Sequence, residues 1–288
     1  MRPATPEREG GMILVNVLMF VAIASGLVLL MINREELALD RSIRAREAAR
    51  ALAVVRGGEL SALVALQRDA RIAPEADYPG EPWGALAEDG IAIEGGRFDL
   101  ALADAQGRFN VNSVRRGEDP IPQLVFLRIA RAAGLTDEQG VAAIALIRER
   151  GPVQDLRPLG AFLPPDKAAL LARMVTALPG DTPVNLNAAT PELLGVLFEP
   201  DKVPRLLAVR NRQGYLSKED LAREDVTVPA GTGFQSNHYW VRTRATIGGT
   251  VQQGATLIER VKTEAGIQAI PVERWRNAAI PPEVPGFG

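Results

Sequence analysis

An uninterrupted apolar segment near the N-terminus constrains this chain more than any other feature. Residues 12–32 read MILVNVLMFVAIASGLVLLMI and contain no charged residue and one strongly polar residue, Asn16. About 20 apolar residues in a helix match the ~30 Å hydrocarbon core of a bilayer. A secretory signal carries its small-residue cleavage site after the apolar segment, whereas the glycines Gly10 and Gly11 precede it here. The segment therefore predicts a membrane-spanning helix rather than a cleaved signal or a buried core helix.

The helical pattern continues beyond this apolar segment. Apolar residues recur at helical spacing over residues 37–66, and no proline follows the segment before Pro74. A helix that continues to about Arg68 would be roughly 85 Å long, with half of it in lipid. Gly57 and Gly58 are its expected weak point, because glycine is a poor helix former. We predict a stem whose second half packs on a soluble domain; the alternative is a signal anchor followed by an ordinary juxtamembrane helix.

Composition limits the chemistry that the rest of the chain could perform. The 288 residues include no cysteine and a single histidine, His238, which excludes disulfides and thiolate nucleophiles and removes most histidine-based catalysis and zinc binding. A net charge of −2 with scattered Lys and Arg gives no overall field that favours a nucleic-acid partner. The sequence has no glycine-rich phosphate loop, metal-ligand spacing or nucleophile elbow. We therefore predict a protein that is not an enzyme and needs no cofactor.

Two β-hairpins with helices between them are predicted behind the stem. The first hairpin is expected at residues 98–104 and 109–112, and the second at 239–247 and 250–261 around Gly248 and Gly249. Residues 120–225 carry apolar residues at helical spacing. We expect an α+β fold in which the stem packs on one antiparallel sheet that a helical domain of about 100 residues interrupts. The proline-rich residues 266–288 are expected to be a disordered tail.

A short motif occurs twice in the chain. Residues 109–113 and 184–188 share the order apolar, Asn, apolar, Asn, small, and each copy precedes a helical stretch. An asparagine before a helix can accept hydrogen bonds from the free N–H groups of its first turn. We interpret these side chains as helix-capping residues in preference to ligand-binding ones: Asn110, Asn112, Asn185 and Asn187. Thr190, which precedes Pro191, is a further predicted cap.

Taken in order, these features resemble the K-type minor pseudopilins of type II secretion systems. The resemblance lies in Gly11 and the apolar helix after it, GRFNVNSV at 107–114, VNLNAATPELL at 184–194 and the closing hairpin at 239–261. It covers nearly the whole chain. It implies a pilin-like long N-terminal helix packed on an antiparallel sheet and interrupted by an α-helical inserted domain. The domains would be a prepilin leader (1–11), a transmembrane helix (12–32), the stem helix and first hairpin (33–119), a helical insertion with a helix-hairpin-helix-like second half (120–225), the closing hairpin (226–265) and the tail (266–288).

The resemblance also implies how the stem is processed. Prepilin peptidase would cut after Gly11 and leave Met12 as the first residue of the mature chain. Asn16 then stands at the fifth mature position, where other pilins carry a glutamate thought to neutralise the N-terminal amine of a neighbouring subunit. An asparagine cannot neutralise an amine, so Asn16 fits a first subunit at the tip. The alternative is that Asn16 makes a polar contact between helices.

The function implied by the resemblance is that of a minor pseudopilin at the tip of the type II secretion pseudopilus, where it initiates and caps assembly for protein export across the outer membrane. Its partners would be the I-type and J-type minor pseudopilins, the prepilin peptidase and the inner-membrane assembly platform. The chain would cross the bacterial inner membrane once, with its globular domain in the periplasm. Some pseudopilins bind calcium, and oxygen ligands are available here without any EF-hand-like spacing: Asp99, Asp104, Glu224 and Asp225.

A membrane-anchored helix-hairpin-helix DNA-binding protein of the competence type is the alternative function. The local similarity lies in VNLNAATPELLGVLF followed by VPRLLAVRNRQGYLSKEDL. That motif binds phosphate through backbone N–H groups of a glycine-rich hairpin. The hairpin position here, residues 198–203, reads FEPDKV, with two acids that repel phosphate and a proline that has no N–H. A nucleic-acid partner is therefore the less favoured prediction, although Arg205, Arg210 and Arg212 could contact DNA.

Overall fold

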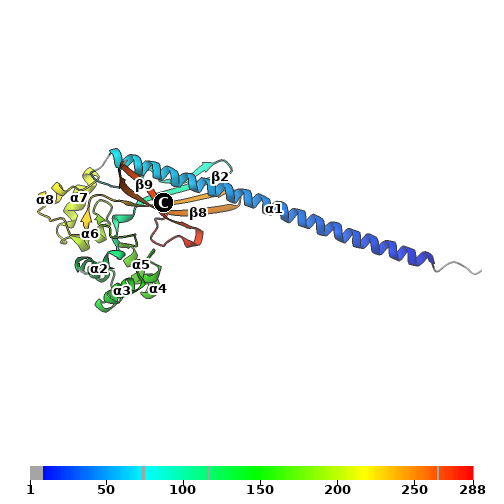
Figure 1. The fold of residues 1–288 in the computed structure, drawn as a ribbon, viewed down its shortest axis with the longest axis horizontal. Coiled ribbons are helices and arrows are strands. Elements are labelled where there is room, and N and C mark those ends of the chain that lie inside the picture. The colour runs from blue at the N-terminus through cyan, green and yellow to red at the C-terminus, as the bar shows by residue number, and fades with distance from the viewer. Residues whose placement is uncertain (1–8, 73–74, 116, 118, 265, 288) are drawn as a thin grey trace, which may run out of the picture.

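One long helix, α1, runs out of a head that contains the rest of the chain (Figure 1). The structure is a computed structural model that describes residues 9–72, 75–115, 117, 119–264 and 266–287. Helix α1 spans Glu9–Ile72, 64 residues, or about 96 Å at 1.5 Å per residue. Residues 12–46 of α1 are exposed, whereas from Ala51 onward one side of the helix is buried. The predicted stem is confirmed, and Gly57 and Gly58 do not interrupt it.

The head contains an antiparallel sheet in the order β1-β2-β7-β8-β9. Its strands are β1 (Glu88–Ile93), β2 (Gly96–Asp104), β7 (His238–Ile247), β8 (Thr250–Thr263) and β9 (Gly266–Arg276). Helix α1 lies across one face of this sheet and buries Ala51, Val55, Ala62 and Leu66 against it, at the 3–4 residue spacing of a single helix face. The predicted α+β fold and the hairpin of β7 with β8 are confirmed.

The first predicted hairpin is wrong. Strand β2 pairs with β1 through the tight connection in which Ile93 is opposite Gly96, and not with residues 109–112. After Asp104 a 3₁₀ turn, η2 (Ala105–Gly107), leads the chain out of the sheet, because the Asp104 carboxylate accepts a hydrogen bond from the Gln106 N–H at 2.7 Å. Strand β1 is almost fully exposed and contains Gly90, so its sequence lacks the alternation that would have identified it.

The inserted domain leaves the sheet after Asp104 and returns at His238, so it is longer than the predicted 120–225. Its elements are β3 (Phe109–Asn110), η3 (Val111–Arg115), α2 (Ile121–Ala132), α3 (Asp137–Arg150), α4 (Arg157–Phe162), α5 (Pro165–Ala172), β4 (Val175–Thr176), β5 (Val184–Asn185), α6 (Pro191–Leu197), α7 (Val203–Gln213), α8 (Lys218–Arg223) and β6 (Thr232–Gly233). The two copies of the Asn motif each begin a short parallel pair, β3 with β4 and β5 with β6. Irregular segments of this kind have no helical spacing, which is why the predicted boundaries were too narrow.

The prediction of a disordered C-terminal tail is wrong for the described residues up to 287. Residues 266–276 form the edge strand β9, which a 3₁₀ turn, η4 (Asn277–Ala279), follows. Val284 then packs with Trp240 and Leu257 on the sheet face opposite α1. Pro271 stands at an irregularity in the pairing of β8 with β9, which an edge strand tolerates. The prolines therefore shape a packed segment and do not prevent one.

Candidate functional site: the membrane stem and its junction with the head

The first half of α1 has the properties of a membrane span. Its most apolar window has a mean hydropathy of 2.7 and no residue buried inside the protein. A single-pass membrane anchor fits this exposure, since lipid would cover the apolar side chains that the protein leaves uncovered. Gly11 and Met12 lie in the first turns of α1, and Asn16 is exposed within the apolar segment. Cleavage after Gly11 and the role of Asn16 remain predictions.

A buried arginine joins the far end of the stem to the sheet. Arg260 of β8 donates to the Asp69 carboxylate of α1 at 2.6 Å and to the Asp77 carboxylate of the following loop, and its guanidinium lies 4.5 Å from the ring centre of Tyr239. Arg260, Asp69 and Asp77 are all buried. Buried charges are tolerated only when they are paired, so this cluster fixes the orientation of the stem on the sheet.

Glu81 adds a third carboxyl group to this cluster. One ligand oxygen each from Asp69, Asp77 and Glu81 lies within 4.8 Å of the others, an arrangement that could hold a cation. Arg260 already supplies positive charge there. Burial, together with the two aspartates, raises the pKa of Glu81 to about 7, so below that pH Glu81 is mostly neutral. Its Oε2 accepts hydrogen bonds from the Tyr78 N–H and the Trp83 Nε1–H. No local pattern in the sequence predicts this cluster, because its members are up to 191 positions apart.

Three of the four carboxylates considered for calcium from the sequence have partners at separate places, and the fourth, Asp225, is exposed beside Glu224. Asp99 accepts a hydrogen bond from Arg244 at 2.7 Å, and Asp104 accepts one from the Ser236 hydroxyl at 2.6 Å. Glu224 lies 3.5 Å from Arg205 in the inserted domain. The structure therefore does not bring the four candidates to one site, and calcium binding stays a prediction.

The motif asparagines cap no α-helix and mainly connect segments, so the capping interpretation is corrected for all but Asn110, which precedes the 3₁₀ helix η3 and accepts from an N–H of its first turn. Asn112 donates to the carbonyls of Val153 and Leu178 and accepts from the Val153 N–H, each at 2.9 Å. Asn187 accepts from the Leu216 N–H at 2.6 Å, which is the corresponding contact in the second copy. Asn110 and Asn185 accept from the N–H groups of Asn112 and Asn187, two positions on. The α-helices begin too far downstream to be capped by any of them, whereas Thr190 does cap α6 through the Leu193 N–H.

Asn185 and its neighbours also fix the inserted domain to the sheet. Its Nδ2 donates to Asp104 at the end of β2, and Ser236 donates to the same carboxylate. Burial raises the pKa of Asp104 to about 6, with these hydrogen bonds opposing the rise. Next to it the side-chain oxygen of Gln106 accepts from the backbone N–H groups of Asn237 and His238. Burial lowers the pKa of His238 to about 4, so its imidazole is neutral at physiological pH and serves the packing of this joint.

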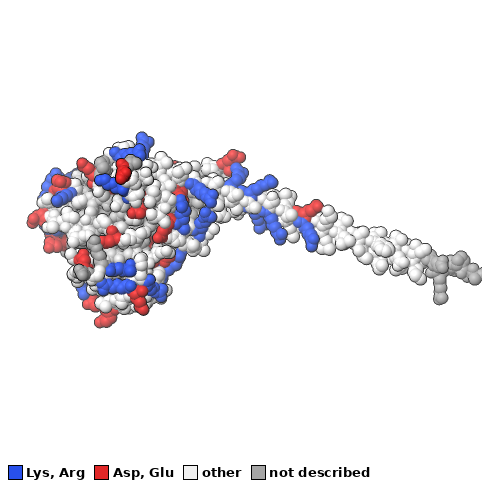
Figure 2. Space-filling view, in the orientation of Figure 1, with Lys and Arg blue, Asp and Glu red and all other residues white. Residues whose placement is uncertain are grey.

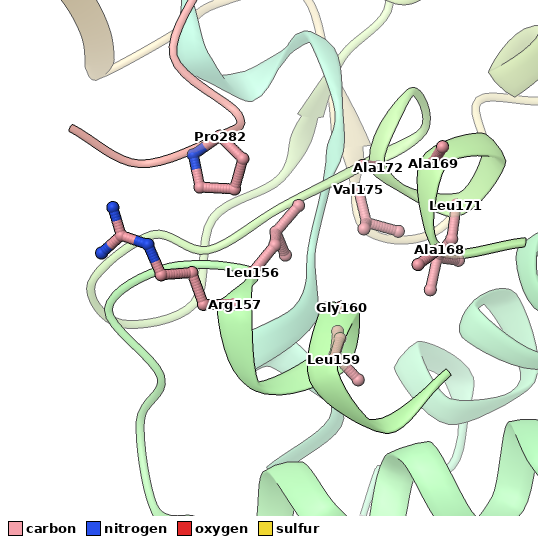
Figure 3. A pocket seen from close by; sticks show the side chains of 10 residues that line it. All are labelled: Leu156, Arg157, Leu159, Gly160, Ala168, Ala169, Leu171, Ala172, Val175 and Pro282. Carbon is pink, nitrogen blue, oxygen red and sulfur yellow. The ribbon is translucent and has the colours of Figure 1, made fainter. Parts of the chain in front are cut away.

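A small apolar cavity of about 350 Å³ lies between α4, α5 and the C-terminal segment (Figure 3). Leu156, Leu159, Leu171 and Val175 are among its lining residues, and Pro282 faces it from the C-terminal segment. Arg157 stands at its rim and donates to the carbonyls of residues 279 and 280. The described lining residues offer no nucleophile or acid–base pair, so the cavity belongs to the packing of the C-terminal segment on the inserted domain.

The DNA-binding alternative loses two of its three arginines in the structure. Arg205 pairs with Asp201 at 3.2 Å and approaches Glu224, and Arg210 donates to the carbonyls of residues 186 and 189. These two hydrogen bonds hold the half-buried Arg210 side chain against the inserted domain. An acidic hairpin with its arginines engaged in this way is a poor phosphate-binding surface.

Comparisons with known proteins agree with the geometry. No protein-family model matches the chain. The chain is 28% identical over 277 residues to the type II secretion system protein K of Pseudomonas aeruginosa, an alignment that covers 82% of each protein. Its fold matches a chain in the crystal structure of the GspK-GspI-GspJ complex from the type 2 secretion system of enterotoxigenic Escherichia coli, with a TM-score of 0.70, 17% identity and coverage of 82% of this chain and 99% of that chain. These findings confirm the resemblance to the K-type pseudopilins and the pilin-like fold predicted from the sequence.

Proposed function

We propose that this chain is a K-type minor pseudopilin of a type II secretion system, a membrane-anchored structural component, and that it occupies the tip of the pseudopilus. The observation that carries the proposal is the combination of a 64-residue stem with a sheet that a large helical domain interrupts. The similarity to a type II secretion protein K supports the family and the process. Initiation and capping of assembly, together with contact with I-type and J-type minor pseudopilins, are the finer parts of the proposal.

The position of the inserted domain supports a place at the tip. Figure 1 places the helices of the insertion at the end of the head far from the membrane span of α1. In a filament whose stems lie side by side, this bulk would extend beyond the envelope of a subunit without an insertion. A subunit at the top has no neighbour above it, so the inserted domain can face outward there.

Processing follows from the same proposal. The inner-membrane prepilin peptidase removes residues 1–11, the mature helix begins at Met12, and the head stays in the periplasm while the assembly platform extracts the stem from the inner membrane. Because the Asn16 amide is uncharged, it needs no amine from a neighbouring subunit to neutralise it in the hydrocarbon core. The chain performs no catalytic step and uses no cofactor in this proposal.

Co-expression of the full-length chain with its I-type and J-type partners and the prepilin peptidase tests this function. We expect a detergent-stable complex of the three and a mature N-terminus at Met12 by mass spectrometry. Gly11→Asp should block processing, and Gly10→Ala is the matched control that should leave it unchanged. A full-length chain that is never processed, or that purifies alone in the presence of both partners, would contradict the proposal.

A further inference from the structure

One side of α1 beyond the apolar segment is basic. At 100° per residue, Arg34, Arg41 and Arg56 fall within about 60° of one another around the helix axis, and Arg44 flanks them. All four are exposed, and among the residues that the structure describes none of them forms an ion pair or hydrogen bond. We call this set of arginines, together with the two from β9 described next, the arginine side.

Two arginines of the sheet extend this side onto the head. Arg274 and Arg276 of β9 line, with Arg56, a cavity of about 350 Å³ between α1 and the edge of the sheet. Among the described residues that line this cavity Glu59 is the one acid, and its oxygens already accept hydrogen bonds from Arg274 at 2.7 Å and from the Thr256 hydroxyl at 2.9 Å. Figure 2 shows basic side chains along the stem close to the head and on the adjoining shoulder of the head.

Apart from Glu59, the acidic residues of the stem lie elsewhere around the helix, and the nearest of them, Glu35, is about 90° from the centre of the arginine side. Glu36, Asp40 and Glu47 fall roughly 130–170° from the centre of the arginine side at 100° per residue. They are too far around the axis to neutralise it. Aligned arginines repel one another, and within the arginine side Glu59 neutralises only Arg274, so an acidic surface that covers this side stabilises it.

The length of the arginine side excludes a lipid surface as its occupant. From Ile32, where the apolar segment ends, to Arg56 is 24 positions along the continuous helix α1, which is about 36 Å. The headgroup layer beyond the hydrocarbon core is only ~5–8 Å thick on each side, so Arg34 alone could reach it. An occupant must instead follow the stem for about 33 Å, from Arg34 to Arg56. A helix that leaves the same membrane in the same direction has this shape.

We infer that the arginine side is the docking surface for an acidic face on the stem helix of a neighbouring minor pseudopilin, which lies parallel to α1 and ends with a carboxylate beside Arg56 and Arg276. This inference rests on the proposed function and specifies the surface that carries it. Exposed charge pairs contribute mainly to specificity and to the rate of association, so the contact selects the correct partner and its alignment along the stem.

Charge reversal on the full-length chain tests the inference. The variant Arg41→Glu/Arg56→Glu places repulsive charges on the arginine side. Arg46→Glu is the control for a charge reversal elsewhere on the stem, because Arg46 is exposed and lies about 140° from Arg41 and about 80° from Arg56 around the axis. Each chain is co-expressed with the I-type and J-type proteins, and the apparent Kd of the complex is measured in detergent at about 50 and 300 mM NaCl. The double variant should bind at least about tenfold more weakly than the wild type at low salt, and the control within about twofold.

The outcomes separate the inference from the proposed function. Wild-type binding that weakens with salt, together with loss of affinity only in the double variant, supports the inference. Equal binding by the wild type and the double variant overturns it and leaves the proposed function standing. Equal weakening of the double variant and of Arg46→Glu also overturns it, because the effect would then not belong to one side of the stem. A wild-type chain that binds neither partner contradicts the proposed function itself. Binding of the wild type to anionic-lipid vesicles that the double variant loses, without any change in partner affinity, would assign the surface to lipid instead.

Discussion

Replacing Gly57 and Gly58 one at a time by alanine should have very different effects on stability, although the two glycines are neighbours in the middle of α1. Gly57 points to open space, since nothing lies within 4 Å of a Cβ atom built on it. A Cβ on Gly58 would lie 2.6 Å from Cζ of Phe98 and 2.9 Å from Cγ2 of Thr243. Carbon atoms pack best at ~3.5–4.0 Å, so the stem approaches the sheet at Gly58 too closely to leave room for a Cβ atom.

The expected magnitudes follow from these contacts. Gly57→Ala removes a poor helix former at no steric cost and should raise the free energy of unfolding by about 1 kcal/mol. Gly58→Ala gains the same helix propensity but overpacks the interface at a cost of about 1–3 kcal/mol. The two variants should therefore differ by about 1–3 kcal/mol, or several degrees in melting temperature for a chain of this size.

Thermal unfolding of the full-length chain in detergent, followed by tryptophan fluorescence, measures this difference. Trp83 and Trp240 are buried in the head and report on the loss of its packing. Adding Phe98→Leu to Gly58→Ala should recover part of the lost stability, because it removes the atom in closest contact. If Gly58→Ala raised the melting temperature as much as Gly57→Ala, the close approach of helix and sheet at this point would be refuted.

Three further predictions concern the junctions inside the head. Arg260→Leu should lower the free energy of unfolding by about 3–5 kcal/mol, because it leaves buried carboxylates unpaired. Arg274→Leu removes an exposed pair and should lower it by at most about 1 kcal/mol in the same urea titration. Equal losses for the two variants would contradict the argument from the buried pair. Asn112→Ala should lower the free energy of unfolding by about 2–4 kcal/mol, because it removes a buried amide that makes three hydrogen bonds. Thr190→Ala, which removes a helix cap, should lower it by about 1 kcal/mol. A loss of stability for Asn112→Ala no larger than that for Thr190→Ala would favour a capping role for Asn112. Burial raises the pKa of Glu283 to about 7, so the folded chain keeps a proton that the unfolded chain loses near pH 4.5. The contribution of Glu283 to stability is therefore full below pH 4.5 and disappears as the pH rises to 7. Glu283→Gln should flatten the fall in stability between about pH 5 and 7, and an unchanged slope would exclude Glu283 as the source of that fall.

Elements with a strong local pattern could be predicted from the sequence. Apolar residues are continuous in segment 12–32, recur at helical spacing in the rest of the stem and alternate in the hairpin of β7 and β8. Each pattern depends only on what that one element contacts, either lipid or the face of another element. Thr190 was identified as a helix cap because capping is a contact between residues three positions apart. In the candidate site, only the membrane span was recognisable in this way.

The partners of these elements were decided by the tertiary structure alone. Alternation in β2 predicts a buried face but not whether the strand pairs with β1 or with residues 109–112, because a period of two is the same for every partner. The asparagines have helix-capping chemistry, yet their bonds reach loops 41 and 66 positions away for Asn112. The C-terminal segment has the composition of a disordered tail until Trp240 and Leu257 supply the apolar surface that orders it.

The long apolar helix by itself predicts a membrane anchor, because every residue of a span must suit the same solvent and the sequence records that requirement position by position. How the stem is held could not be read in the same way. Arg260, Asp69 and Asp77 are ordinary charged residues in the sequence, and only the fold places them in one buried cluster. Their pairing is a property of distance in space, which local periodicity does not record.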